Sequence, residues 1–86
     1  DKTLGKAHYY LGFALYKSGK TQDAATSFRR ATEVDPNYSE AFYRLGKVLE
    51  RLDKKNEAIE AYRAALKIDR DYSDARLALE KLAPPK

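Results

Sequence analysis

Apolar side chains recur three or four positions apart along the chain, a spacing that places them on one face of an α-helix. This pattern is interrupted at Gly19, Pro36, Asp53 and Pro84. Glycine ends helices because it enters the left-handed conformation without steric penalty, and proline disfavours a helical conformation in the residue before it. No segment shows the alternation of a strand. The pattern therefore predicts an all-α chain whose last helix runs over about 73–82.

Each predicted helix has a face that we expect to pack against its neighbours. In the first pair of helices these positions are Ala7, His8, Leu11, Gly12, Leu15, Ala24, Ala25, Phe28, Ala31 and Thr32. In the second pair they are Phe42, Leu45, Gly46, Leu49, Ala58, Ile59, Tyr62, Ala65 and Leu66. The small residues allow paired helices to approach closely, and the rings of Phe28 and Tyr62 fill the space that they leave. Thr21 is expected to cap the second helix.

The sequence also repeats itself with a period of 34 residues, and 11 of the 34 aligned positions are identical. The identities include Ala7 with Ala41, Tyr9 with Tyr43, Gly12 with Gly46 and Ala24 with Ala58. We predict two repeat units at 5–38 and 39–72, a single helix at 73–82 and a tail at 83–86. A repeat of this length that forms two helices leaves one apolar face uncovered, so its core is built by stacking.

The spacing His8-x-x-Leu11-Gly12-x-x-Leu15, followed by Ala24-x-x-x-Phe28-x-x-Ala31, resembles the tetratricopeptide repeat. The resemblance covers about 5–72, and 73–82 is similar to the helix that caps such arrays. It implies a right-handed α-α superhelix of five antiparallel helices. In this family the first helix of each unit lines a concave groove that holds a peptide or a partner helix. The chain departs from the family pattern at His8, Arg70 and Arg76.

Composition narrows the classes of function. The 86 residues include 17 Lys and Arg and 13 Asp and Glu, a net charge of +4, and no cysteine, which excludes disulfides and thiolate metal sites. No apolar run reaches the roughly 20 residues of a membrane helix. Because the chain has no methionine, we expect it to be a processed product or an excerpt. The sequence does not indicate a compartment.

The sequence contains no recognisable catalytic motif. His8 is the single histidine and is expected to pack rather than to act as a base or a metal ligand. The sequence contains no glycine-rich phosphate loop, nucleophile elbow or paired buried carboxylates. We therefore predict a chain that is not an enzyme and binds no metal or cofactor.

A second sector of the first and third helices, turned away from their packing faces, carries aromatic and basic residues. We predict that this sector binds a protein or peptide with apolar or aromatic anchors and acidic character. Its candidate residues are Lys6, Tyr9, Tyr10, Phe13, Tyr16, Lys17, Tyr43, Arg44, Lys47 and Arg51. One family subset holds a terminal carboxylate with a clamp, and the corresponding positions are Tyr9, Phe13, Arg44, Asp74 and Ala78. Only Arg44 among them is basic, which disfavours that ligand.

Other interpretations of these residues stay open. Tyr10 and Phe13 could pack against another helix, and Tyr38 and Tyr72 are expected to pack between units. Single-stranded nucleic acid can stack on aromatics beside cations, but Glu40 and Glu50 interrupt the sector and disfavour this partner. Self-association through the exposed ends of the stack is the remaining alternative.

Overall fold

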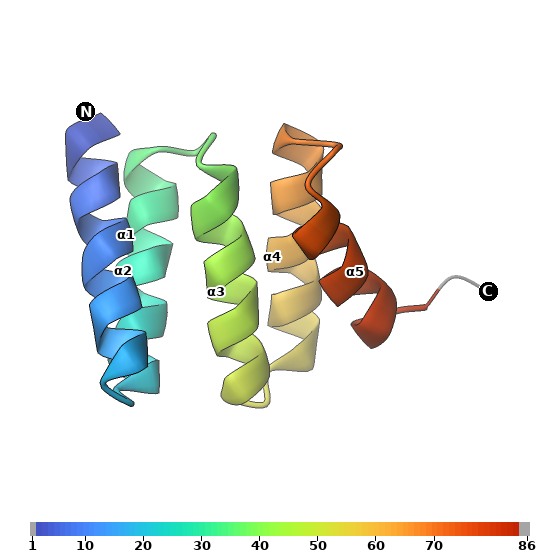
Figure 1. Cartoon of the computed structure of the whole chain (residues 1–86), viewed down its shortest axis with the longest axis horizontal. Helices are drawn as coiled ribbons and strands as arrows, with labels where there is room; N and C mark the ends of the chain where they lie inside the picture. The colour runs from blue at the N-terminus through green and yellow to red at the C-terminus, as the bar shows by residue number, and fades with distance from the viewer. Residues whose placement is uncertain (1, 85–86) are drawn as a thin grey trace.

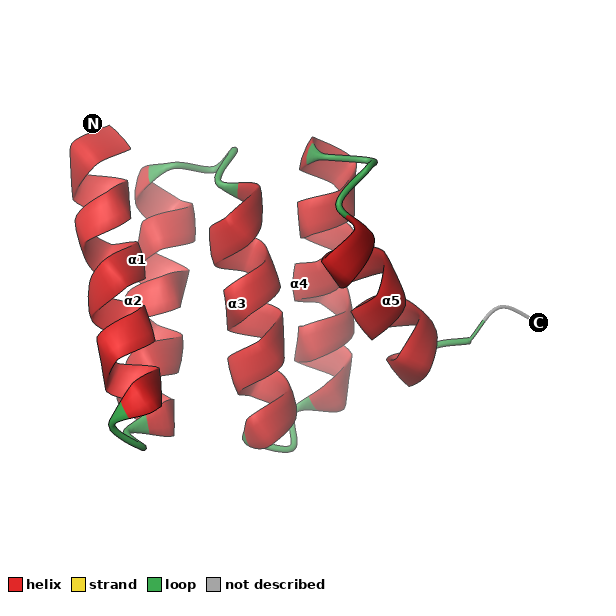
Figure 2. Cartoon of the chain, in the orientation of Figure 1, coloured by secondary structure: helices red, strands yellow, loops and turns green. Residues whose placement is uncertain are grey.

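The computed structural model describes residues 2–84, which form helices and no strands (Figures 1 and 2). The predicted all-α fold is confirmed. The five helices are α1 (Lys2–Lys17), α2 (Thr21–Val34), α3 (Ser39–Arg51), α4 (Lys55–Ile68) and α5 (Ser73–Leu82). The last two residues of the predicted tail, 85–86, lie outside the described residues.

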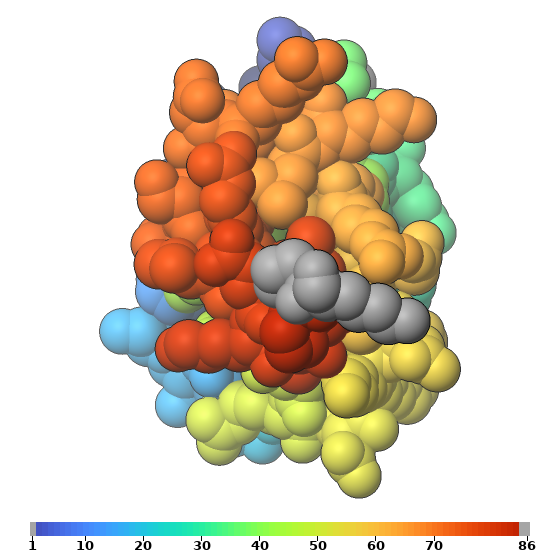
Figure 3. All heavy atoms as spheres, turned by 90° about the vertical axis from the view of Figure 1, so that its right-hand side faces the viewer, coloured from blue at the N-terminus to red at the C-terminus, as the bar shows by residue number. Residues whose placement is uncertain are grey.

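The helices form an antiparallel stack in which each helix packs against the next one along the chain. In Figure 1, α1, α3 and α5 lie toward the viewer and α2 and α4 lie behind them. We call these two sides the odd-helix face and the even-helix face. The stack measures 39 × 26 × 16 Å, so it is a slab with two broad sides. At one end α5 lies across α4, as the space-filling view in Figure 3 shows.

The two tight connections inside the helix pairs have the same backbone geometry. Gly19 has a φ of 85°, and Asp53, which stands 34 positions later, has a φ of 62°. The backbone N–H groups of Lys20 and Lys54 each donate to the carbonyl five residues earlier, at 2.9 Å. The prediction that Thr21 caps α2 was wrong, because Lys20 is the capping residue and makes no side-chain capping bond.

Aromatic rings pressed against glycines hold each helix pair together. Phe28 and Tyr62 are 1% and 0% exposed. A Cβ on Gly12 would lie 2.9 Å from Cδ1 of Phe28, and a Cβ on Gly46 would lie 2.5 Å from Cε1 of Tyr62. Real Cβ atoms do not approach other atoms so closely, so the α1–α2 and α3–α4 spacings depend on these glycines.

The packing face predicted for α1 is only partly correct. Gly12 is buried and His8 and Leu15 are half-buried, but Ala7 is exposed and Leu11 is 51% exposed. On the equivalent face of α3, Leu45, Gly46 and Leu49 are buried because α2 packs against it, and Phe42 is half-buried. Within residues 2–84 no helix covers α1 in the way that α2 covers α3.

Two tyrosines at the start of α3 and α5 pack back onto the preceding odd-numbered helix. The ring centroids of Tyr38 and Tyr9 are 5.0 Å apart, and those of Tyr72 and Tyr43 are 5.2 Å apart. Each ring pair therefore joins an odd-numbered helix to the residue that precedes the next odd-numbered helix, at the boundary between the predicted units. Burial, followed by the nearby Tyr9 and Glu40 groups, raises the pKa of Tyr38 to about 12. Burial and Glu40 likewise raise the pKa of Tyr72 to about 12.

Gly46→Ala is expected to destabilise the fold, because the added Cβ meets the buried Tyr62 ring. Overpacking of this kind costs about 1–3 kcal/mol, which exceeds the roughly 1 kcal/mol that alanine gains over glycine in a helix. Urea unfolding followed by circular dichroism measures the change. Lys55→Ala, at an exposed position of α4, is the control and should leave the midpoint unchanged. A Gly46→Ala protein as stable as the parent would contradict the proposed constraint.

Stability is expected to fall as the pH rises from about 10 to 12, because Tyr38 and Tyr72 keep their protons in the folded state above their ordinary pKa of 10.0. The unfolded chain releases these protons first, so alkaline pH favours unfolding. Thermal unfolding midpoints across this pH range measure the effect. The Tyr38→Phe/Tyr72→Phe double variant should show a shallower decline. An identical decline in both proteins would contradict the assignment.

Candidate functional site

All ten residues predicted to bind a partner lie on α1 and α3. The structure leaves four of them exposed, namely Lys6, Tyr10, Lys17 and Arg51. The other six are half-buried, namely Tyr9, Phe13, Tyr16, Tyr43, Arg44 and Lys47. The rings of Tyr9 and Tyr43 contact the buried rings of Phe28 and Tyr62, at 5.7 and 5.9 Å between centroids. These two tyrosines therefore support the fold as well as the surface.

Cations of α1 and α3 lie over aromatic rings of the same two helices. The guanidinium of Arg44 lies 5.1 Å from the centroid of Phe13 and 5.6 Å from that of Tyr43. The guanidinium of Arg51 lies 5.3 Å from the Tyr16 centroid, and its Nη1 donates to the Tyr16 hydroxyl at 3.3 Å. Lys17 Nζ lies 5.1 Å from the Phe13 centroid. We call this set the cation–ring row, and each such contact contributes about 0.5–1 kcal/mol at an exposed site.

Two polar groups of this face are fixed by partners within the chain. Burial lowers the Arg44 pKa, but a side-chain hydrogen bond with Tyr9 and the nearby phenols outweigh it and leave the pKa raised. Arg44 therefore stays charged. The Tyr62 hydroxyl donates to the Glu50 carboxylate, and burial followed by this bond raises the Tyr62 pKa. This bond holds Glu50 against α4 and uses part of the hydrogen-bonding capacity of its carboxylate.

Beside the cation–ring row, a hollow of about 300 Å³ opens between α3 and α5. We call it the α3–α5 pocket. Its apolar part is contributed by Leu77, which is 57% exposed, and by Ala78. The complete lining is Tyr43, Lys47, Glu50, Asp74, Leu77, Ala78 and Lys81. Two predicted residues, Tyr43 and Lys47, are therefore brought together with a set of α5 residues.

The α5 residues of this pocket were missing from the sequence-based candidates. The 34-residue period contained the signal, since Leu77 and Lys81 stand 34 positions after Tyr43 and Lys47. From the sequence, 73–82 was predicted only as a single helix, and the repeat was not extended there to the binding positions. Conversely, Lys6 and Tyr10 lie on α1 outside the pocket lining.

The described part of the chain has neither a metal-binding cluster nor a membrane-spanning helix. Among residues 2–84, no group of three or more His, Cys, Asp and Glu side chains is arranged to hold a metal ion. None of the helices in that range combines the length and the apolar character needed to cross a bilayer.

The chain is similar to known proteins over most of its length. The family model described as Tetratricopeptide repeat matches residues 9–75. The crystal structure of MamA superimposes with a TM-score of 0.90 and 29% identity, covering 95% of this chain and 48% of MamA. The solution structure of a tetratricopeptide repeat domain protein from Salinibacter ruber gives a TM-score of 0.84 and 28% identity, covering 95% of this chain and 89% of that one.

A curated relative is the small glutamine-rich tetratricopeptide repeat-containing protein 2 of Mycosarcoma maydis, which is 43% identical over 37 residues. These residues make up 43% of this chain and 10% of that protein. The chain thus spans about a tenth of this relative and about half of MamA. Because the family model covers more than half of the sequence and the helices superimpose on solved members, the chain belongs to the tetratricopeptide repeat family.

Proposed function

We propose that this chain is a non-catalytic interaction module whose odd-helix face holds a segment of a partner protein. Tetratricopeptide repeats are generally protein–protein interaction modules, and their fold is a scaffold rather than an enzyme fold. The observation that carries the proposal is the cation–ring row lying directly beside the α3–α5 pocket. The two features share Tyr43, so one bound segment can contact both.

The charges of this face favour an acidic partner. Lys47 and Lys81 both line the α3–α5 pocket, and Arg44 and Arg51 lie in the adjoining row. Of the two carboxylates in the pocket, Glu50 is held by Tyr62. A carboxylate of the partner can approach the edge of a stacked guanidinium without unstacking it, because the N–H groups lie in the guanidinium plane.

The apolar part of the pocket selects the anchor. Leu77 is half-exposed and lines the pocket together with the small residue Ala78, so an apolar or aromatic side chain of the partner gains burial there. A terminal-carboxylate clamp is disfavoured, because the corresponding positions include Asp74 and Ala78. We therefore propose that the bound segment is an acidic stretch with aromatic or apolar anchors.

Titration with a short acetylated peptide in which two phenylalanines stand among glutamates is expected to shift the backbone amide signals of Lys47, Leu77 and Ala78. The Lys47→Glu/Lys81→Glu double variant should bind about tenfold more weakly, because repulsion replaces attraction at both cations. Two-dimensional NMR locates the site, and calorimetry gives the affinity.

The matched control is Lys67→Glu/Lys55→Glu, which makes the same charge change on α4. Equal weakening by both double variants would indicate attraction by net charge alone and contradict the proposed site. Tighter binding of single-stranded oligothymidine than of the peptide at physiological salt would favour nucleic acid as the partner instead.

A second candidate function is self-association through α1. Leu4 and Leu11 are each 51% exposed, whereas Leu45, the equivalent of Leu11, is 4% exposed under α2. The exposed alanines Ala7 and Ala14 lie beside these leucines on the helix and allow another helix to approach closely. We propose that α1 pairs with α1 of a second copy of the chain through this stripe.

Sedimentation velocity across protein concentrations is expected to show a dimer that the Leu4→Gln/Leu11→Gln double variant loses. The reason is that the variant places polar groups on the only stripe that the proposed pairing buries. Leu77→Gln, an equally exposed leucine on the odd-helix face, is the control and should leave the dimer intact. A parent chain that stays monomeric at millimolar concentration would contradict this candidate function.

A further inference from the structure

The even-helix face carries an apolar groove that the proposed function does not use. Two adjoining hollows, of about 370 and 550 Å³, lie beside α4 and share Phe42 of α3. The first is bounded by Arg29 of α2, and the second by Pro36 and Asn37 of the α2–α3 connection. The floor of the first consists of Phe42, Leu45 and Leu49, with Ala61 of α4 beside them. The second continues past Phe42 along α4 toward Ile68. We call the two hollows together the even-helix groove.

This groove lies on the opposite side of α3 from the α3–α5 pocket. At about 100° per residue, Tyr43 and Lys47 lie roughly 160° and 200° around the helix from Leu45. A segment bound in the even-helix groove therefore does not contact the side of α3 that faces α5. The two sites can be occupied at the same time.

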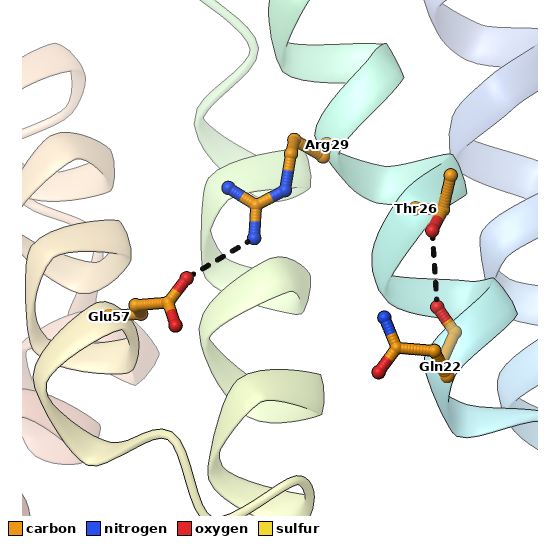
Figure 4. A network of polar contacts seen from close by, with 4 residues as sticks. All are labelled: Gln22, Thr26, Arg29 and Glu57. Atoms are coloured by element: carbon orange, nitrogen blue, oxygen red, sulfur yellow. Dashed lines mark hydrogen bonds and ion pairs between the residues drawn. The ribbon is translucent and has the colours of Figure 1, made fainter.

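An ion pair spans the groove. Arg29 of α2 reaches past α3 to Glu57 of α4, with 3.5 Å between Nη2 and Oε1 (Figure 4). The two side chains are 48% and 53% exposed, so water competes for both partners. Exposed pairs of this kind hold weakly. A cation from outside can therefore replace Arg29 on Glu57.

The repeat explains why Arg29 reaches across the groove. Its equivalent 34 positions later, Arg63, pairs with Glu60 on its own helix at 3.0 Å. In α2 the position equivalent to Glu60 is Thr26, whose hydroxyl donates to the Gln22 carbonyl oxygen at 3.3 Å (Figure 4). Thr26 offers no carboxylate to Arg29, and the carboxylate that Arg29 meets is Glu57 across the groove.

The lining defines the chemistry of an occupant. The floor is apolar, and the α4 wall at the end near Asn56 carries the carboxylates of Glu57 and Glu60, both more than half exposed. Lys67 lines the opposite end. From Glu57 to Lys67 the wall is about 15 Å long, which suits a short segment of a partner chain.

We propose that the even-helix groove is a second docking site, which takes a partner segment with apolar anchors next to a lysine or arginine. The anchors cover Phe42 and Leu49, and the basic residue replaces Arg29 on Glu57, with the exposed Glu60 on the same wall. This partner is opposite in charge to the acidic segment proposed for the odd-helix face. The module can thus join two different segments across its thickness.

The experiment uses two acetylated, amidated peptides that share a pair of leucines and differ only in having two lysines or two glutamates beside them. The lysine peptide is expected to shift the amide signals of Leu45, Ala61 and Ala64 in the parent chain, and the glutamate peptide to bind about tenfold more weakly. The Glu57→Lys/Glu60→Lys variant should lose about tenfold in affinity for the lysine peptide, while the fold is checked by circular dichroism.

Two further variants test the role of the ion pair. Arg29→Gln should tighten binding of the lysine peptide about twofold to threefold, because it frees Glu57. Arg30→Gln makes the same charge change at an exposed position of α2 outside the groove lining, and should have no effect. Lys47→Glu on the odd-helix face should also leave this affinity unchanged.

Equal affinities of the two peptides, shifts confined to α5 and the Tyr43 side of α3, or no shift at millimolar lysine peptide would each overturn the proposal. These outcomes are independent of the odd-helix site, which is tested with a peptide of the opposite charge. If no peptide binds at one face, the proposal for the other face is still tested by its own titration.

Discussion

The structure depends on an aromatic ring packed directly onto a glycine in each helix pair. Tyr62 on Gly46 and Phe28 on Gly12 hold the paired helices closer than any other residue at the glycine position would allow. Because the same contact recurs 34 residues later, both pairs have the same spacing and stack in register. The Tyr62 hydroxyl reaches past its glycine to Glu50 and so also fixes part of the odd-helix face.

Helix α3 contributes to several features of the structure at once. One side of α3 packs on the Tyr62 ring through Gly46. Beside this side, Leu45 and Leu49 line the even-helix groove. The remaining side presents Tyr43 and Lys47 to the α3–α5 pocket. At 3.6 residues per turn, these sides interleave along 13 residues of helix. Each side therefore gains its chemistry from different residues of α3.

The aromatic residues of the odd-helix face serve packing and, in the proposed function, recognition as well. Tyr9 and Tyr43 pack on buried rings and on the tyrosines that begin the next odd-numbered helix, while Phe13 and Tyr16 support Arg44 and Arg51. The cations are held in place before a partner arrives, so less side-chain entropy is lost on binding. Such pre-organisation supports the proposed binding of an acidic segment.

Hydrophobic periodicity and the 34-residue repeat were sufficient to predict the all-α fold, its five helices and the glycine–ring contacts, because these follow from short-range spacing within each unit. They also placed Tyr43, Arg44 and Lys47 on one side of α3. The repeat predicted the same burial for Leu11 as for Leu45, but burial depends on which helix lies alongside, and only α3 is covered by α2. Likewise, the contribution of Leu77 and Lys81 to the pocket and the reach of Arg29 to Glu57 depend on distances between helices, which only the tertiary structure sets.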